Sequence, residues 1–287
     1  MKRIVYLLCI VILGVSCQQK QEKKTESEPV NSAPKQEATI LDGVYHFMFK
    51  NFDLWTLQDI QRKMPASLFP DAKKSDLSQY MPNGEADAAI NTFLIKKNGK
   101  FILFDTGLGL ENGGFMVDKL TLLNIKPEDI SAICITHCHA DHIGGMVSQG
   151  KAFFPNADVY CSDKELEAFK NDPKTREMVN VYGSRIHPFT AGDVLLDDIR
   201  TIDATGHTPG HTFYQLDNLL IVGDLIHAAA LQIPHPEYCA KYDANKIQAA
   251  KTRHNAYQYI RDNKLVVAGM HLPFSGVILN FEKEQQK

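Results

Sequence analysis

"THCHADHIGG", residues 136–145, is the stretch that decides the fold. It places His137, His139, Asp141 and His142 so close together that their imidazole rings would repel one another once protonated. Imidazole nitrogens and carboxylate oxygens suit zinc and other first-row divalent ions, and a bound cation offsets the cost of clustering these groups. Histidines two positions apart can converge on one ion from a strand end, while Asp141 and His142 continue into the turn. The segment therefore predicts a metal site.

Three later segments supply further candidate ligands. "TGHTPGHT", "VGDLIH" and "AGMHLPF" contain His207, Asp224 and His271, and each segment follows an expected strand. Because side chains at the ends of adjacent strands can meet at one edge of a sheet, we expect these residues to share one cleft with the first four.

Hydrophobic patterns around these motifs predict strands interspersed with helices. Residues 88–97 and 100–107 are rich in β-formers and are joined by Asn98-Gly99, a strong signal for a tight hairpin. Ser162 and Glu165 fit a capping box before a helix that runs to Phe169. The other expected helices are residues 116–124 and 245–263, and the other expected strands are residues 129–136, 199–205, 212–217, 218–224 and 265–270. This mixed order indicates sheets packed on each other with helices outside, an α/β sandwich.

The composition is that of an ordinary globular protein, with 44% apolar and 23% charged residues. Lys and Arg (31) nearly balance Asp and Glu (34), so no strong field favours nucleic acid. We expect one folded domain over residues 41–287, a small molecule as the partner, and no nucleic acid.

The N-terminus has a different character. Residues 1–17, "MKRIVYLLCIVILGVSC", combine two positive charges, a short apolar run and small residues before Cys17, as in a secretory leader. The end resembles the lipobox of bacterial lipoproteins, although Gly14 stands where leucine is usual. We therefore expect a signal peptide over residues 1–17, lipid on Cys17, and an exported, membrane-anchored protein at the periplasm or cell surface. A plain leader cut elsewhere or a short membrane anchor is the alternative. Residues 18–40 lack aromatic side chains and predict a disordered tether.

The order H-x-H-x-D-H, then a later His, an Asp and a final His, resembles the metallo-β-lactamase fold superfamily. "FDTG", residues 104–107, is similar to another motif of that superfamily. The resemblance covers roughly residues 88–274 and implies an αββα sandwich with the site at one edge. It also implies two metal ions: His137, His139 and His207 would hold one, Asp141, His142 and His271 would hold the second, and Asp224 would bridge them.

"VGDLIHAAALQ" and "GMHLPFSG" look like the branch that contains methyl parathion hydrolase and related lactonase-like enzymes. The resemblance implies a binuclear metal-dependent hydrolase that uses a metal-bridging hydroxide on lactone, aryl ester or phosphotriester-type small molecules. Zinc is the expected metal, and manganese, cobalt or iron would also accept these ligands. Relatives in this branch are often dimers, so a homodimer is possible.

Two residues are candidate catalytic groups besides the metals. Asp141 could carry a proton toward the leaving group. His227 stands where related lactonases carry a tyrosine beside the substrate oxygen, so we expect it to donate a hydrogen bond to the oxyanion or leaving group. A histidine merely packed in the pocket wall is the alternative. His211 and Asp105 are expected to support the ligands.

Several alternatives remain open at this point. Lactamases proper place a cysteine where Asp224 stands, which lowers the rank of a β-lactamase-like enzyme. Glyoxalase-like thiolester hydrolases extend into a basic C-terminal segment, whereas this chain ends soon after His271. A metal-binding lipoprotein without catalysis is a further possibility. Cys134, Cys138, Cys161 and Cys239 are expected to be buried free thiols, and the aromatic residues Phe52, Trp55, Phe69 and Tyr80 could face substrate or pack in the core.

Overall fold

Two β-sheets packed face to face form the centre of the computed structural model, which describes residues 35–36, 42–273 and 275–286. The first sheet has the strand order β1-β2-β3-β4-β5-β6-β9-β10 and the second has the order β11-β12-β13-β14-β15-β16. The strands of the first sheet are β1 Lys35–Gln36, β2 Val44–Met48, β3 Asp53–Pro65, β4 Glu85–Lys97, β5 Lys100–Phe104, β6 Ile130–Cys134, β9 Asp158–Ser162 and β10 Ile186–Phe189. Those of the second are β11 Val194–Leu195, β12 Ile199–Asp203, β13 Thr212–Leu216, β14 Leu219–Ile221, β15 Val266–Ala268 and β16 Val277–Ile278, and a separate hairpin pairs β7 Val147–Ser148 with β8 Lys151–Ala152.

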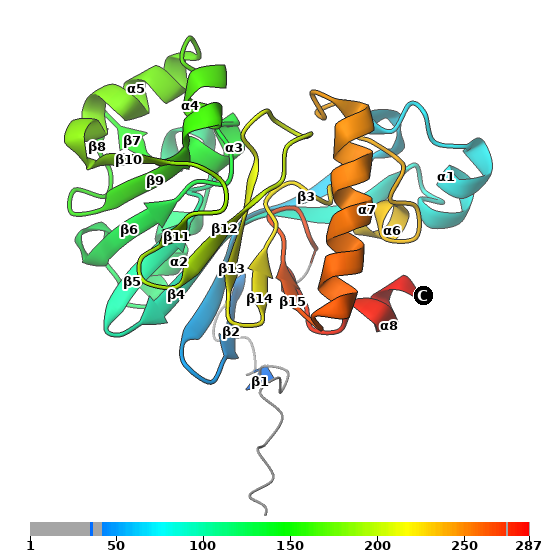
Figure 1. Ribbon diagram of the computed structural model, residues 1–287, viewed down its shortest axis with the longest axis horizontal. Helices are drawn as coiled ribbons and strands as arrows, with labels where there is room; N and C mark the ends of the chain where they lie inside the picture. The colour runs from blue at the N-terminus through cyan, green and yellow to red at the C-terminus, as the bar shows by residue number, and fades with distance from the viewer. Residues whose placement is uncertain (1–34, 37–41, 274, 287) are drawn as a thin grey trace, which may run out of the picture. The chain divides into compact units, whose positions relative to one another are not determined.

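Helices cover the outer faces of both sheets (Figure 1). Met116 and Leu120 of α2 (Met116–Leu122) and Met178 and Tyr182 of α5 (Pro173–Tyr182) pack on the first sheet. On the second sheet lie α7 (Lys246–Asp262) and α8 (Phe281–Gln285). The remaining helices are α1 Lys74–Tyr80, α3 Ala140–Ile143, α4 Asp163–Ala168 and α6 Ala229–Gln232, with 3-10 turns at Ala66–Leu68, Leu110–Asn112, Pro127–Asp129 and Gly183–Arg185.

The main core lies between the two sheets. Phe47, Phe93 and Phe104 of the first sheet meet Tyr214 and Ile221 of the second, all of them buried. Burial of such apolar area is the dominant stabilising contribution in a domain of this size. With helices outside each sheet, the layers are α, β, β and α, and the αββα sandwich predicted from the sequence is confirmed.

Most predicted elements near the site are confirmed. β4 and β5 pair antiparallel across Asn98-Gly99, and both turn residues have positive φ, 50° and 77°, as a tight hairpin requires. α2, β6, α4, β12, β13, β14, α7 and β15 lie where the hydrophobic patterns place them. The capping box is half correct: the Ser162 hydroxyl accepts the amide proton of Glu165 at 3.1 Å, but the Glu165 side chain points to residues of two other loops.

Of the four aromatic residues before "FDTG" that could face substrate, Trp55 lies in β3 and Tyr80 ends α1, whereas Phe52 and Phe69 lie outside the strands and helices. Phe52 and Phe69 are buried in the core, and Trp55 stacks on His46 with ring centroids 4.7 Å apart. The signal peptide, Cys17 and most of the tether fall outside the described residues, except that Lys35–Gln36 pair with β2. Among the described helices, none combines the length and hydropathy needed to cross a bilayer.

Candidate metal centre

Loops that follow four strands bring the predicted ligands together. The loop after β6 carries His137 and His139 and continues into α3 with Asp141 and His142. The loops after β12, β14 and β15 carry His207, Asp224 and His271. Two groups result, one of His137, His139, His207 and Asp224 and one of Asp141, His142 and His271, with the potential ligand atoms of each group within 4.8 Å of one another. Apart from Asp224, which the resemblance places between two ions, the two groups have the members that the resemblance implies, and metal binding by them stays a prediction.

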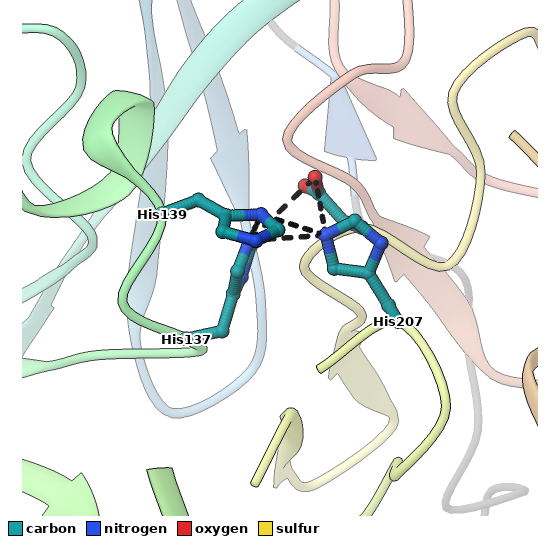
Figure 2. A group of neighbouring side chains, drawn as sticks. His137, His139 and His207 are labelled. Atoms are coloured by element: carbon teal, nitrogen blue, oxygen red, sulfur yellow. Dashed lines mark hydrogen bonds and ion pairs between the residues drawn. The ribbon is translucent and has the colours of Figure 1, made fainter. Parts of the chain in front are cut away.

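Three imidazole nitrogens of the first group face one another. His137 Nε2 lies 3.0 Å from His139 Nδ1 and 3.2 Å from His207 Nε2, and His139 Nδ1 lies 3.1 Å from His207 Nε2. Figure 2 shows these three rings turned toward a common point. His139 is the exception in the cluster, because it presents Nδ1 where the others present Nε2.

Asp224 lies between the two groups. Its Oδ2 is 3.2 Å from His207 Nε2 and 3.1 Å from His271 Nε2, while its Oδ1 is 3.1 Å from His142 Nε2. Asp141 is farther out, with Oδ2 3.6 Å from His271 Nε2, and its side chain is 28% exposed. Asp224 is thus within reach of both groups, and Asp141 is partly exposed at the edge of the site.

Buried acceptors behind the rings fix their orientation. His207 Nδ1 donates to Asp243 Oδ1 at 2.9 Å, His142 Nδ1 to Asp105 Oδ2 at 2.7 Å, and His271 Nδ1 to the Ala89 carbonyl at 2.9 Å. Because Nδ1 carries the proton in each neutral ring, the lone pair of Nε2 is directed into the cluster. Such outer partners are typical of histidines that bind metals.

His137 is oriented through Thr136. The Thr136 hydroxyl donates to Asp105 Oδ2 at 2.7 Å, so its own lone pair accepts from His137 Nδ1 at 3.1 Å. Asp105 itself has φ 56°, an uncommon conformation for a residue other than glycine. In this conformation the Asp105 carboxylate accepts hydrogen bonds from both Thr136 and His142, in agreement with the supporting role expected for Asp105.

The charges of the cluster depend on these contacts. Burial alone would raise the pKa of Asp224, but His142, His271 and His137 hold it well below its ordinary value. Burial would lower the pKa of His207, yet Asp224 and Asp243 raise it to about 9. At His139, burial and the neighbouring His207 lower the pKa to about 4, so this ring is neutral near pH 7. The carboxylates therefore stay ionised and attract positive charge into the cluster.

These donors fit metal ions. With Nδ1 of His137 and His207 bonded outward, their Nε2 atoms face each other and His139 Nδ1 with lone pairs, an arrangement that repels unless a cation or extra protons intervene. His142 Nε2 and Asp224 Oδ1 are both buried and make no well-aligned hydrogen bond within the described part of the chain. Buried groups of this kind could be satisfied by an ion bound between them. The donor set, imidazole nitrogen and carboxylate oxygen, is the one that zinc and neighbouring divalent ions accept.

His211 supports Asp224 and is not a member of either group of predicted ligands. Its Nδ1 donates to the Ala204 carbonyl at 3.2 Å, and its Nε2 accepts the backbone amide of Asp224 at 3.1 Å. Gly223, before Asp224, has φ 47°, and a Cβ there would lie 2.3 Å from His211 Nε2. The close approach therefore requires glycine, and it fixes the backbone of Asp224.

Glu165 is a structural residue that the sequence analysis missed as part of the site. Its carboxylate accepts the amide of Cys138 at 2.9 Å, the amide of Gly210 at 2.8 Å and the hydroxyl of Thr208 at 2.8 Å. It thereby connects the loop of the first two ligands with the loop of His207. A glutamate three positions after a cap residue predicts a capping box within its own helix. Its contacts with two distant loops leave no mark in the sequence.

His227 is buried beside Asp224. Its Nε2 lies 3.3 Å from Asp224 Oδ2, its ring stacks on that of His271, and neither ring nitrogen makes a hydrogen bond to the described residues. Asp224, His227 and His271 are also close enough to hold an ion as a trio. The role expected for His227 toward the substrate stays a prediction.

A cleft of about 380 Å³ opens onto the cluster, a volume at the lower end of small-molecule sites. Its lining includes four of the predicted ligands, with Arg62, Met64, Leu108 and Tyr242 as further walls, whereas His227 is not part of it. A larger groove of about 570 Å³ between α4, α5 and β10 contains none of the predicted ligands. The smaller cleft is the candidate substrate site, because it alone of the two contacts the cluster.

The cysteines are buried free thiols, as expected for the described residues. Cys138 Sγ lies 3.9 Å from Cys161 Sγ, behind the ligand loop. Cys138 thus packs in the core between two ligand positions and does not contribute to the cluster.

A two-sheet sandwich with histidines and aspartates gathered at its strand ends defines a class of proteins built to hold metal ions. The chain belongs to the metallo-beta-lactamase superfamily, whose family model matches residues 87–265. Sequence and structure thus confirm the resemblance at the level of the superfamily.

Known relatives cover only part of the chain. The exodeoxyribonuclease WalJ of Streptococcus pneumoniae is 33% identical over 102 residues, which are 36% of this chain and 35% of that protein. A probable metallo-hydrolase of Bacillus subtilis, YybB, is 28% identical over 142 residues, 47% of this chain and 61% of that protein. The chain thus spans about a third of the length of the first of these relatives.

Solved structures match more completely. The hydrolase AbOPH, described as a member of the beta lactamase superfamily, superposes with a TM-score of 0.75 at 27% identity over 84% of this chain and 93% of that one. AidC, a dizinc quorum-quenching lactonase in complex with the product N-hexanoyl-L-homoserine, has a TM-score of 0.74 at 26% identity over 82% of this chain and 92% of that one. The structural neighbours therefore include lactonase-like hydrolases.

Proposed function

We propose that this protein is a binuclear metal-dependent hydrolase of lactone, aryl ester or phosphotriester-type small molecules. One observation carries the proposal: imidazole nitrogens and the Asp224 carboxylate face one another with their lone pairs at the bottom of a cleft of small-molecule size. AidC and AbOPH, which share the fold over most of the chain, support a lactonase-like hydrolase.

The proposed ligands are His137, His139 and His207 for one ion and Asp141, His142 and His271 for the other, with Asp224 between them. Bound there, the ions would supply Lewis-acid activation of water and of the substrate's carbonyl or phosphoryl oxygen. Zinc is the metal we propose, because nitrogen donors dominate the set.

The chain itself orients the donors and handles the proton. Asp105, Asp243 and the Ala89 carbonyl hold Nδ1–H of three histidines, so their Nε2 atoms keep a fixed direction. The carboxylate of Asp141 borders the cleft and is partly exposed, so it can accept a proton at Oδ1 or Oδ2 and pass it to a leaving oxygen. Met64, Leu108 and Tyr242 would enclose the apolar part of a substrate.

His227 provides a test of the second catalytic role. If it donates a hydrogen bond to the reacting oxygen, His227→Ala should lower kcat by about 100-fold while two metal ions per chain are retained. Metal content and kcat are measured on the same preparation, with the exposed His254→Ala as a matched control. Unchanged turnover would reject the role, and loss of an ion would make His227 a ligand instead.

The proposed function as a whole is tested by metal content and a substrate panel. Purified protein loaded with zinc or manganese is analysed for bound metal and assayed on a lactone, an aryl ester, a phosphotriester, a cephalosporin and a glutathione thiolester. We expect two ions per chain and hydrolysis of at least one of the first three. Activity on the cephalosporin or thiolester alone would favour the alternative hydrolases. If none of the five substrates is hydrolysed, a metal-binding protein without catalysis is favoured.

DNA belongs in the same panel because one relative is an exodeoxyribonuclease. Its degradation at rates above those for the small molecules would contradict the proposal. Asp224→Ala is the control for every substrate, since it removes the carboxylate that lies between the two groups.

We further propose that the protein is exported and lipid-anchored through Cys17, from the leader pattern in residues 1–17. A palmitate label incorporated in the wild type but not in Cys17→Ser, with membrane association lost in the variant, would support the anchor. Equal labelling of both would contradict it. A homodimer, which the resemblance makes possible, is tested by sedimentation of the protein without its first 40 residues, about the length of the predicted leader and tether.

A further inference from the structure

We propose that Arg62 makes the cleft selective for substrates that carry a carboxylate a few atoms away from the bond to be hydrolysed. The inference rests on the proposed hydrolase function and names the substrate class of that site. It comes from the position of Arg62 on β3, from the absence of an ion-pair partner for it among the described residues, and from the charge of the cleft.

β3 directs Arg62 into the cleft. Arg62 pairs with Ala88 of β4, and its neighbour Lys63 pairs with Asp87. Since successive side chains of a strand point to opposite faces, Arg62 and Met64 share one face and Lys63 lies on the other. Arg62 and Met64 both line the cleft, together with Asp141, His271 and Tyr242.

The two adjacent cations differ in their partners. Lys63 Nζ lies 2.5 Å from Asp87 Oδ1 and 3.8 Å from Glu85 Oε1, so its charge is balanced on its own face of the sheet. Arg62 is exposed and makes no ion pair with any carboxylate that the structure describes. A guanidinium at the edge of a cleft that has no ion-pair partner in the described part of the chain is available to a ligand.

The carboxylates of the cleft do not neutralise Arg62. Asp141 and Asp224 both border it, but both belong to the proposed ligand set. If two divalent ions are bound, their four positive charges would exceed the three negative charges of Asp141, Asp224 and a bridging hydroxide, with the histidine ligands neutral. The loaded centre would therefore be positive, and Arg62 would add to that charge. An anionic group on the substrate is attracted, whereas a second cation is repelled.

The chemistry of arginine specifies the group. Its planar guanidinium offers parallel N–H donors that match the two oxygens of a carboxylate. With the reacting ester or lactone oxygen at the ligand cluster, the carboxylate of the same molecule would lie toward Arg62. The cleft volume of about 380 Å³ limits such a substrate to a small molecule, for example a half-ester of a short dicarboxylic acid.

A pair of matched esters tests the selectivity. Mono-4-nitrophenyl glutarate carries a free carboxylate, and its methyl ester is neutral with nearly the same shape. We expect the ratio of kcat/KM for the acid to kcat/KM for the methyl ester to fall by about 10- to 100-fold in Arg62→Gln. Lys63→Gln, which removes the adjacent cation outside the cleft, should leave the ratio at the wild-type value.

Binding of glutarate gives a readout that does not need turnover. Calorimetry on the zinc-loaded protein should show a Kd about 10-fold higher or more in Arg62→Gln than in the wild type and in Lys63→Gln. If neither ester is hydrolysed but glutarate binding depends on Arg62, the proposed function fails while the anion site stands. An ester ratio and a glutarate Kd that are the same in wild type and Arg62→Gln would overturn the inference.

Discussion

Glu165 is a single residue that fixes the relative position of two loops of the site. Its carboxylate accepts hydrogen bonds from Cys138, Thr208 and Gly210, so the loops of His137 and His207 are held at a fixed separation. In Glu165→Gln, the amide nitrogen would face a donor and one of these contacts would be lost. Because outer partners of ligands typically contribute 10- to 100-fold to metal affinity, we expect zinc affinity to fall by about that factor.

Zinc affinity is measured by competition with a chromophoric chelator. Glu167→Gln is the matched control, since Glu167 lies on the same helix but is exposed, and among the described residues its carboxylate pairs only with Lys170. The prediction is contradicted if both variants bind zinc as tightly as the wild type.

Candidate site residues that cluster in a motif could be predicted from the sequence. An isolated candidate such as Arg62 could not. His137 to His142 form a dense pattern with an obvious chemical cost, which indicates a metal. Arg62 stands in the polar run "QDIQRKM", where no neighbour marks it as different from Lys63. Only the direction of β3 distinguishes the two, and that direction depends on tertiary structure.

Among the elements, α7 holds the segment between Asp224 and Asp243 in place. The buried Arg253 on this helix donates from Nε to the Leu225 carbonyl at 2.7 Å, from Nη1 to Pro236 and Tyr238 carbonyls at 2.9 and 3.0 Å, and from Nη2 to Asp243 at 3.3 Å. Asp243 in turn orients His207. The helix acts on the site mainly through this side chain, and Thr252 Oγ1 also donates to the Thr205 carbonyl at 2.7 Å, in the loop of His207.

Arg253→Met should lower the free energy of unfolding by about 3–5 kcal/mol, since it leaves Asp243 buried without its cation and several carbonyls without a donor. Urea unfolding of the metal-free protein measures this difference without a contribution from bound ions. Lys251→Met, an exposed change on the same helix, should stay within about 0.5 kcal/mol of the wild type. Equal destabilisation by both changes would show that the Arg253 contacts contribute nothing specific.

Elements were predictable where local patterns are strong. The hairpin at Asn98-Gly99 and the long helix α7 follow from turn chemistry and hydrophobic period. β3 was missed because its second half is polar and its register shifts between Gln58 and Ile60. A strand of this kind is fixed by its partner β4, and pairing with a distant segment leaves no local signal.

Loops from the two sheets of the molecule meet at the candidate metal centre. The proposed ligands among residues 137–142 follow a strand of the first sheet, whereas His207, Asp224 and His271 follow strands of the second. Bound ions would therefore link the two sheets and stabilise the folded state. At free zinc a hundredfold above Kd, the contribution is about 2.7 kcal/mol, which corresponds to a Tm higher by about 5–10 °C in a chain of this size.

Thermal unfolding with and without a chelator measures this shift. His207→Ala is the control, because it removes a ligand of one ion, and its Tm should respond less to the chelator. The expectation is contradicted if the chelator leaves the Tm of the wild type unchanged.

The layer arrangement at this scale followed from the family motif more than from local patterns. Once H-x-H-x-D-H and "FDTG" are placed at strand ends, a sandwich with the site at one edge is the consistent solution. The strand order was not predictable, because the parallel pairing of β5 with β6 and of β14 with β15 joins segments separated by helices. Such pairings depend on long-range packing rather than on neighbouring residues.

His139 differs from the other rings in the atom that it turns inward, Nδ1. That nitrogen stands as many bonds from its Cα as the side-chain oxygen of asparagine or aspartate, whereas Nε2 is one bond farther. Position 139 is therefore where an oxygen donor could replace imidazole without a change in reach. Exchange at this one position would make the coordination harder and move its preference from zinc toward manganese, so the choice of element can drift in evolution while the backbone stays the same.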